Sequence, residues 1–182
     1  TQYAKKVDDA LRPFLLATHF PLILVSTDPL ASIYRSVCSL PNLVDETVFI
    51  SPDRVSLTEL SAMARPVLDN YYANQLTEIK ALFEERTGQN RVTTDWADTA
   101  WAATHGMIGL LLVDFEQSVK GSIDEAGKLS LSEDPDAHDV LDEIVRRALE
   151  SGAKILAVRA NDMVGDTGIA AILRYTVSFE QQ

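Results

Sequence analysis

Apolar and polar positions follow their clearest pattern between residues 139 and 179, where they predict a helix, a buried strand, a polar loop and a second strand. The helix is indicated by apolar residues that recur at the spacing of one helix face: Val140, Leu141, Ile144, Val145 and Leu149. Gly152 supplies the left-handed residue that closes such a helix. Residues 154–158 form a short apolar run, which is typical of a strand covered on both faces. With residues 110–113 as the first strand, this stretch predicts a βαβ unit.

The last strand is predicted over residues 169–179, after a polar loop at residues 161–168. The small residues at its start allow another backbone or a helix to approach closely. We therefore expect residues 169–175 to pair inside the central sheet. Arg174 should face outward or pair with a carboxylate, because an unpaired buried guanidinium is costly. The loop and strand together form the candidate interaction surface, which consists of Asp162, Gly165, Asp166, Gly168 and Arg174.

Between residues 87 and 138 the pattern predicts a helix from Thr94 or Asp95 to Thr104, closed by Gly106. Residues 118–123 and 129–131 are expected to form an antiparallel pair, with Gly127 at a turn position that needs positive φ. Asp134 and Pro135 fit the N-cap and first position of the following helix.

A long helix is predicted from the capping box Ser56-Leu-Thr-Glu59 to Arg86. Pro66 interrupts its pattern, and a proline inside a helix costs about 3 kcal/mol. We therefore expect a kink or a break at Pro66, and we interpret residues 56–86 as the connection between two parts of the chain. Residues 87–182 form the second part.

Residues 1–55 form the first part of the chain and contain fewer elements. The pattern predicts an amphipathic helix at residues 3–16 and a buried strand at residues 21–25. A capping turn at Ser26-Thr-Asp-Pro29 leads into a helix over residues 30–39, and a short edge strand is expected at residues 47–50. One central strand is too little for an independent domain. We therefore interpret residues 1–55 as the back half of an α/β domain whose front half is missing.

Charge and composition narrow the class of protein. The 182 residues suit one large domain or two small ones, and 46% of them are hydrophobic, which provides for a sizeable core. Residues 56–182 carry eleven Lys and Arg against twenty-one Asp and Glu, a net charge of −10. Such a surface repels phosphate backbones. No apolar run is long enough to cross a membrane, and a single cysteine, Cys38, fits a reducing cytoplasm.

Candidate catalytic residues are few. Ser26, Thr27 and Asp28 follow a predicted buried strand, where α/β enzymes often place a site, but helix capping explains them equally well. No motif joins the three histidines, His19, His105 and His138, and the acidic residues around 124–139 lack the pattern of a calcium loop. No phosphate-binding loop, dinucleotide fingerprint or nucleophile elbow is present. We expect no catalytic site, metal or cofactor in this chain.

Several strings, taken in their order along the chain, resemble known proteins. Residues 95–106, 108–114 and the ending Gly168-Ile-Ala-Ala-Ile-Leu-Arg-Tyr175 resemble the third domain of archaeo-eukaryotic class 1 peptide release factors and Pelota. Residues 3–7 through 22–26 resemble the later part of their central, ribonuclease-H-like domain. The remaining strings resemble bacterial archaeo-eukaryotic release factor family 11: residues 29–37, 51–54, 83–86 and 140–144.

The resemblance implies a fold and a role. Residues 87–182 are expected to form an α/β/α sandwich with a mixed sheet, similar to the kink-turn-binding ribosomal-protein fold, behind the back half of a ribonuclease-H-like domain. The catalytic tripeptide of release factors is expected upstream of Thr1, and Thr87-Gly88-Gln89 is interpreted as a helix end. The implied protein is bacterial and cytoplasmic. Its partner is the ribosome or another protein, and its role is peptide release or ribosome rescue, with this segment serving for docking.

Two other functions stay open at this point. The first is a small hydrolase with its site at Ser26–Asp28, against which the absence of a paired base and nucleophile counts. The second is a kink-turn RNA-binding protein, against which the acidic balance of residues 56–182 counts.

Overall fold

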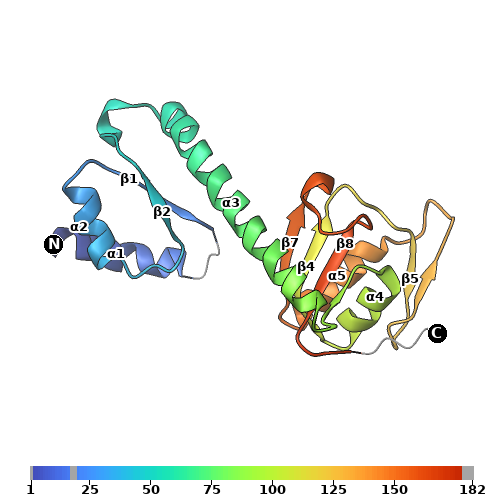
Figure 1. Ribbon diagram of the computed structural model, residues 1–182. Helices are drawn as coiled ribbons and strands as arrows, with labels where there is room; N and C mark the ends of the chain where they lie inside the picture. The colour runs from blue at the N-terminus through green and yellow to red at the C-terminus, as the bar shows by residue number, and fades with distance from the viewer. Residues whose placement is uncertain (1, 17–19, 178–182) are drawn as a thin grey trace. The chain divides into compact units, whose positions relative to one another are not determined.

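The computed structural model of the chain describes residues 2–16 and 20–177 (Figure 1). Its internal contacts divide the chain into two compact units, residues 1–75 and residues 76–182. The division lies within the long helix α3 (Leu57–Thr87), and each unit is described by itself. The borders expected from the sequence, at residues 55/56 and 86/87, stay a prediction.

The first unit is built on a small parallel sheet. Strands β1 and β2 pair in parallel, with Leu22 opposite Leu43 and Val25 opposite Val48, and α1 packs against α2. The predicted strand at residues 21–25 is present as β1, but its four residues are only half-buried. The predicted edge strand begins earlier than expected, because β2 already pairs from Leu43. The elements of this unit before α3 are α1 (Gln2–Leu15), β1 (Leu22–Val25), α2 (Leu30–Val37), β2 (Leu43–Val48) and the 3-10 turn η1 (Pro52–Arg54).

A buried carboxylate joins the two helices of the first unit. Asp8 of α1 is 2% exposed and accepts hydrogen bonds from the Ser39 hydroxyl at 2.7 Å and the Ser39 N–H at 3.1 Å. The hydrogen bond from the Ser39 side chain is the main cause that holds the pKa of Asp8 below its ordinary value. The end of α2 is thereby fixed to α1.

Helix α3 begins as the sequence predicted. The Glu59 carboxylate accepts from the Ser56 N–H at 2.8 Å, and the Ser56 hydroxyl accepts from the Glu59 N–H at 3.3 Å, which is the reciprocal pattern of a capping box. The helix then runs without a break through Pro66. The predicted break is therefore wrong, and the alternative of a kink stays a prediction. Val67, buried to 4% exposure directly after Pro66, favours continuation of the helix by its packing.

A mixed four-stranded sheet forms the middle of the second unit, in the order β3-β8-β4-β7. Strands β4 and β7 are parallel, and β8 is antiparallel to both β3 and β4. Helix α5 follows β4 and precedes β7, which confirms the predicted βαβ unit. The strands are β3 (Val92–Thr93), β4 (Ile108–Asp114), β7 (Lys154–Val158) and β8 (Ile169–Leu173).

The two faces of this sheet are covered by different helices (Figure 1). Alternate residues of the strands point to opposite faces: Leu111 and Val113 of β4 pack in one core with α4 (Trp96–Thr104) and α5 (Val140–Glu150). Leu110 and Leu112 pack in a second core with Ile79 of α3. The unit is therefore a three-layer α/β/α sandwich with a mixed sheet, as predicted.

Strand β8 lies inside the sheet, which confirms the prediction for the small residues at its start. Ala171 lies opposite Leu111 of β4 and Thr93 of β3. It packs in the core under α4 and α5, whereas its neighbour Ala170 packs in the core on the α3 side. The strand ends at Leu173, before the predicted end at residue 179. Residues 174–177 are not in the strand, and residues 178 and 179 lie outside the described part of the chain.

The predicted hairpin is present as β5 (Gly121–Ile123) and β6 (Leu129–Leu131), although β5 begins at Gly121 and not at residue 118, and Gly127 in its turn has φ +87°. The predicted cap of α5 is wrong. Asp139, not Asp134, is the N-cap, and its carboxylate accepts from the Leu141 N–H at 2.9 Å. Asp134 instead accepts from the Asp136 N–H within a separate turn. Among the described helices, none combines the length and the apolarity that a bilayer crossing requires.

Candidate functional site

A small cavity lies at the carboxyl end of the parallel pair β4–β7. The loops that follow parallel strands meet at one edge of a sheet, and in α/β folds this edge commonly holds the site. Asp114 is the last residue of β4, and the short 3-10 turn η2 (Ala160–Asp162) begins two residues after the end of β7. The cavity has a volume of about 170 Å³ and is lined by Asp114, Gln117, Ala160, Met163, Gly165, Asp166 and Gly168.

Asp114 is the buried polar group of this cavity, with 2% of its surface exposed. One carboxylate oxygen, Oδ1, accepts from the Glu116 N–H at 3.0 Å. Its main chain is held on both sides, since its N–H donates to the Gly168 carbonyl at 2.9 Å and its carbonyl accepts from the Gln117 N–H at 3.1 Å. No donor from the described residues reaches Oδ2, and no described Lys or Arg forms an ion pair with Asp114.

The loop on the other side of the cavity owes its shape to two glycines. Gly165 and Gly168 have φ of +82° and +76°, a conformation that disfavours residues with a Cβ. A Cβ at Gly168 would lie 2.5 Å from Cγ of Gln117, so a larger residue there would force the Gln117 side chain to move. The Thr167 hydroxyl donates to the Thr94 carbonyl at 2.6 Å, and the Trp96 indole donates to the Thr167 carbonyl at 3.0 Å. The loop is therefore anchored to the start of α4.

The structure brings three residues of the predicted interaction surface together, namely Gly165, Asp166 and Gly168. Asp162 lies in η2 nearby but does not line the cavity.

Arg174 lies at the opposite end of the sheet, since its N–H donates to the carbonyl of Met107, the residue before β4. Its guanidinium donates to the carbonyls of Gly106 at 3.2 Å and Ser151 at 2.8 Å. Of the two alternatives predicted for Arg174, the pairing with a carboxylate is wrong, and the outward-facing side chain stays a prediction. The two carbonyls follow the ends of α4 and α5, where helices carry partial negative charge.

Sequence reasoning missed Asp114 and Gln117. A signal for Asp114 was available, because it directly follows the apolar run of β4, and a polar residue at the carboxyl end of a parallel strand is a common site position. The local sequence gave no comparable signal for Gln117, which reaches the cavity through the turn at residues 114–117.

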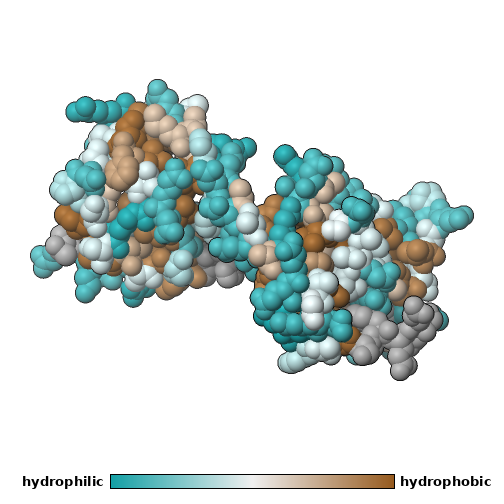
Figure 2. Space-filling model, viewed as in Figure 1, coloured by the Kyte–Doolittle hydropathy of each residue, from teal (hydrophilic) through white to brown (hydrophobic). Residues whose placement is uncertain are grey.

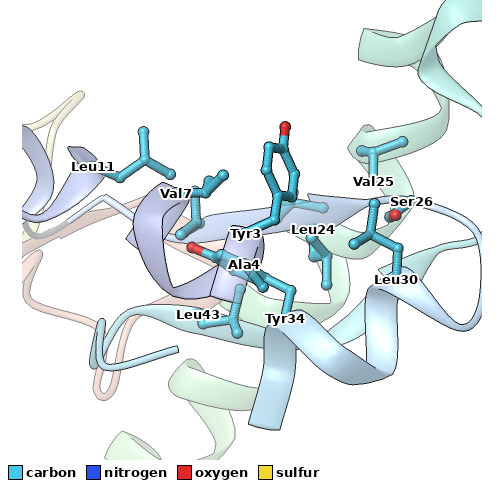
Figure 3. Close-up of a pocket in the computed structure, with 12 residues that line it drawn as sticks. Tyr3, Ala4, Val7, Leu11, Leu24, Val25, Ser26, Leu30, Tyr34 and Leu43 are labelled. Carbon is cyan, nitrogen blue, oxygen red and sulfur yellow. The ribbon is translucent and has the colours of Figure 1, made fainter. Parts of the chain in front are cut away.

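A second cavity, of about 390 Å³, lies within the first unit (Figure 3). Most of its lining is apolar and comes from α1, β1 and α2, with the buried Tyr34 among the wall residues and Ser26 at one end, as Figure 3 shows. Figure 2 shows apolar surface on this unit, and several of its large apolar residues are exposed: Tyr3, Phe14, Phe20, Leu30 and Phe49.

The residues of the hydrolase alternative make only local contacts. The Ser26 hydroxyl donates to the Thr27 carbonyl at 3.4 Å, and the Asp28 carboxylate accepts from the Ser32 hydroxyl at 2.8 Å. No imidazole or carboxylate of a described residue is hydrogen-bonded to Ser26. The predicted capping of α2 is not seen either, because Pro29 occupies the N-cap and no side chain caps the helix.

Candidate metal ligands do not gather in the described part of the chain, where no group of three His, Cys, Asp or Glu could hold an ion. His105 stacks on Trp101 with ring centroids 4.2 Å apart, and His138 is exposed. His19 lies outside the described residues.

Comparison with solved structures shows the same fold in release-factor-like proteins. S. cerevisiae Dom34 matches with a TM-score of 0.65 and 16% identity, over 97% of this chain and 52% of that chain. Ribosome-bound archaeal Pelota, solved with ABCE1, matches with a TM-score of 0.60 and 17% identity, over 97% of this chain and 50% of that chain. The chain thus spans about half the length of these proteins. Comparison with curated proteins gave no match.

The sequence itself also carries a family match, which covers the first unit. Residues 1–74 match bacterial archaeo-eukaryotic release factor family 11, which confirms the resemblance to that family over this segment.

Proposed function

We propose that this chain is the C-terminal part of a translation-release-factor-like protein that acts in peptide release or ribosome rescue. The observation that carries the proposal is the fold match with S. cerevisiae Dom34 over 97% of the chain. Dom34 is described as a translation termination-like factor involved in RNA quality control and interacting with Hbs1, and the matched Pelota is ribosome-bound. The family match of residues 1–74 supports the same assignment from sequence.

Within that protein, the chain serves for docking and not for chemistry. Ser26 has no base among the described residues, and the cavity beside Asp114 contains no paired nucleophile and base. The second unit offers instead an anchored loop and a small polar cavity at one end of its sheet. The proposed partner is the ribosome or a protein bound to it, in the bacterial cytoplasm, and no cofactor is required.

The charge of residues 56–182, a stretch that includes the second unit, bears on how this part of the chain docks. With a net charge of −10 over residues 56–182, broad contact with ribosomal RNA is unfavourable. The same charge favours a basic protein surface as the partner. For this reason the kink-turn RNA-binding alternative is the weaker one.

Co-sedimentation with bacterial ribosomes that carry a stalled peptidyl-tRNA tests the proposal. The protein should sediment with the ribosomes, and Asp166→Lys at the cavity should weaken the association. Glu133→Lys, the same charge reversal on the acidic loop before α5, serves as the matched control and should weaken it less. An intact protein that stays in the supernatant at low and physiological salt would contradict the proposal.

A further inference from the structure

We propose that the cavity between the ends of β4 and β7 takes the side chain of an arginine from a protein partner, with its guanidinium against Asp114. This inference rests on the proposed docking function and specifies the chemistry by which the partner is held.

The first argument is the set of acceptors in the cavity that have no cationic partner. Asp114 is a carboxylate with 2% exposure and a single side-chain hydrogen bond, from the Glu116 N–H. Its Oδ2 has no hydrogen-bond donor among the described residues, so it is available to accept from a cationic side chain that enters the cavity. Asp166 on the same cavity forms no ion pair within the described chain either. A cation that enters the cavity therefore finds two carboxylates without a positive partner.

The size of the cavity selects a side chain. Its volume of about 170 Å³ is below the range of roughly 300–1,000 Å³ that is typical of small-molecule and cofactor sites. A bare metal ion is disfavoured, because two carboxylates are too few and no third His, Cys, Asp or Glu of the described residues completes a set. With a small molecule and a metal ion disfavoured, the remaining occupant is one long side chain.

The lining favours arginine over lysine. The acceptors come from separate elements: Asp114 ends β4, Gln117 lies in the turn after it, and Asp166 lies in the loop before β8. A guanidinium presents five N–H donors in one plane and can serve acceptors on several sides, whereas an ammonium is a compact point charge. Met163, at 9% exposure, adds an apolar wall for the aliphatic part of the side chain.

The walls of the cavity are already held in place. The N–H of Asp114 donates to the Gly168 carbonyl, and Thr167 is hydrogen-bonded to both Thr94 and Trp96. A preformed site of this kind loses little conformational freedom when a ligand binds. The site is therefore suited to hold one anchoring residue of a larger interface.

The experiment is a titration of the ¹⁵N-labelled chain with N-acetyl-arginine amide, followed by backbone amide chemical shifts. The neutral, nearly isosteric N-acetyl-citrulline amide and the lysine analogue N-acetyl-lysine amide serve as the two control ligands. We expect saturable shifts at residues 114–117 and 163–168 with the arginine probe, weaker binding with lysine and none with citrulline. Asp114→Asn should weaken arginine binding by at least about tenfold, because it removes one partner of a buried charge pair. Glu133→Gln, which removes a charge outside the cavity, should leave the affinity unchanged.

Equal binding of citrulline, lysine binding as tight as arginine binding, or an unchanged affinity of Asp114→Asn would each overturn the inference. If Asp114→Asn does not fold, Asp166→Asn and Gln117→Leu provide the test instead. Weaker arginine binding by both variants supports the site. Unchanged binding by either variant rejects it. Ribosome co-sedimentation of the same proteins separates the two proposals. Arginine binding without ribosome association rejects only the docking function, and association without arginine binding rejects only the cavity.

Discussion

At the scale of single residues, Glu143 on α5 shows how charge is organised on the second unit. Its Oε1 accepts from Arg146 Nη2 at 2.7 Å and from Arg147 Nε at 2.7 Å. Hydrogen bonds from Arg146 first, and then from Arg147, lower the pKa of Glu143 from 4.5 to about 2. Arg147 also donates to the Ile123 carbonyl at 3.0 Å, so this group ties α5 to the hairpin β5–β6.

The first prediction is a pH dependence of stability. The pKa of Glu143 is lower in the folded state than its ordinary 4.5. Its contribution to the free energy of unfolding is therefore fully present above pH 4.5 and is lost as the pH falls toward about 2. Glu143→Gln should therefore reduce the loss of unfolding free energy between pH 6 and pH 3, as measured by urea unfolding at both values. Glu150→Gln removes the other carboxylate that contacts Arg146 and serves as the control. Its unfolding free energy should fall between pH 6 and pH 3 as much as that of the parent. Identical pH profiles for Glu143→Gln and the parent would refute this assignment.

At the scale of elements, two local devices determine where helix α3 starts and how β8 is covered. The capping box of Ser56 and Glu59 fixes the first turn of the helix. Strand β8 pairs on both sides and lies between helices, so its alanines have no free space around them: Ala170 and Ala171 are both 0% exposed.

Removal of the cap by Ser56→Ala should lower the free energy of unfolding by about 1 kcal/mol, since the Glu59 N–H loses its acceptor. Chemical denaturation monitored by circular dichroism measures the change. Ser61→Ala is the matched control within the same helix. Its hydroxyl donates to the Leu57 carbonyl, which remains available to the helix, so little change is expected. If Ser61→Ala lowered the free energy of unfolding as much as Ser56→Ala, the capping box would contribute nothing specific to stability.

Ala171→Phe should destabilise the second unit by about 1–3 kcal/mol, because the ring has no room between the sheet and the helices α4 and α5. Calorimetry or urea unfolding gives the change. Ala97→Phe places the same ring on an exposed position of α4 and should alter stability by no more than about 0.5 kcal/mol. Unchanged stability of Ala171→Phe would mean that β8 is not covered as the structure shows.

At the scale of the whole molecule, the charge decides which partners are possible. The chain has a formal net charge of −11, and most of it lies after residue 55. Long-range repulsion of a phosphate backbone follows from that balance, whichever fold the chain adopts.

We therefore predict no binding of kink-turn RNA at physiological salt, measured by electrophoretic mobility shift. A shift of the RNA at low protein concentration would restore the RNA-binding alternative.

We also predict that this chain alone hydrolyses neither peptidyl-tRNA nor model esters, because Ser26 has no base among the described residues. Ester turnover that disappears in Ser26→Ala would restore the hydrolase.

The sequence by itself determined most of the elements, because their signals are short-range. The capping box at Ser56, the apolar run of β4 and the positive φ of Gly127 each depend on neighbours within a few positions. Apolar periodicity likewise located α5 and β7, and the small residues at 168–171 placed β8 inside the sheet.

Only the tertiary structure decided what depends on contacts between distant residues. Arg174 is satisfied by carbonyls at residues 106 and 151, and α3 continues through Pro66, next to the buried Val67. The cavity exists because the turn after β4 meets the loop before β8, which brings Asp114 beside Gly168. No local pattern encodes such a meeting, since side chains far apart in sequence become neighbours only when strand order and register are fixed.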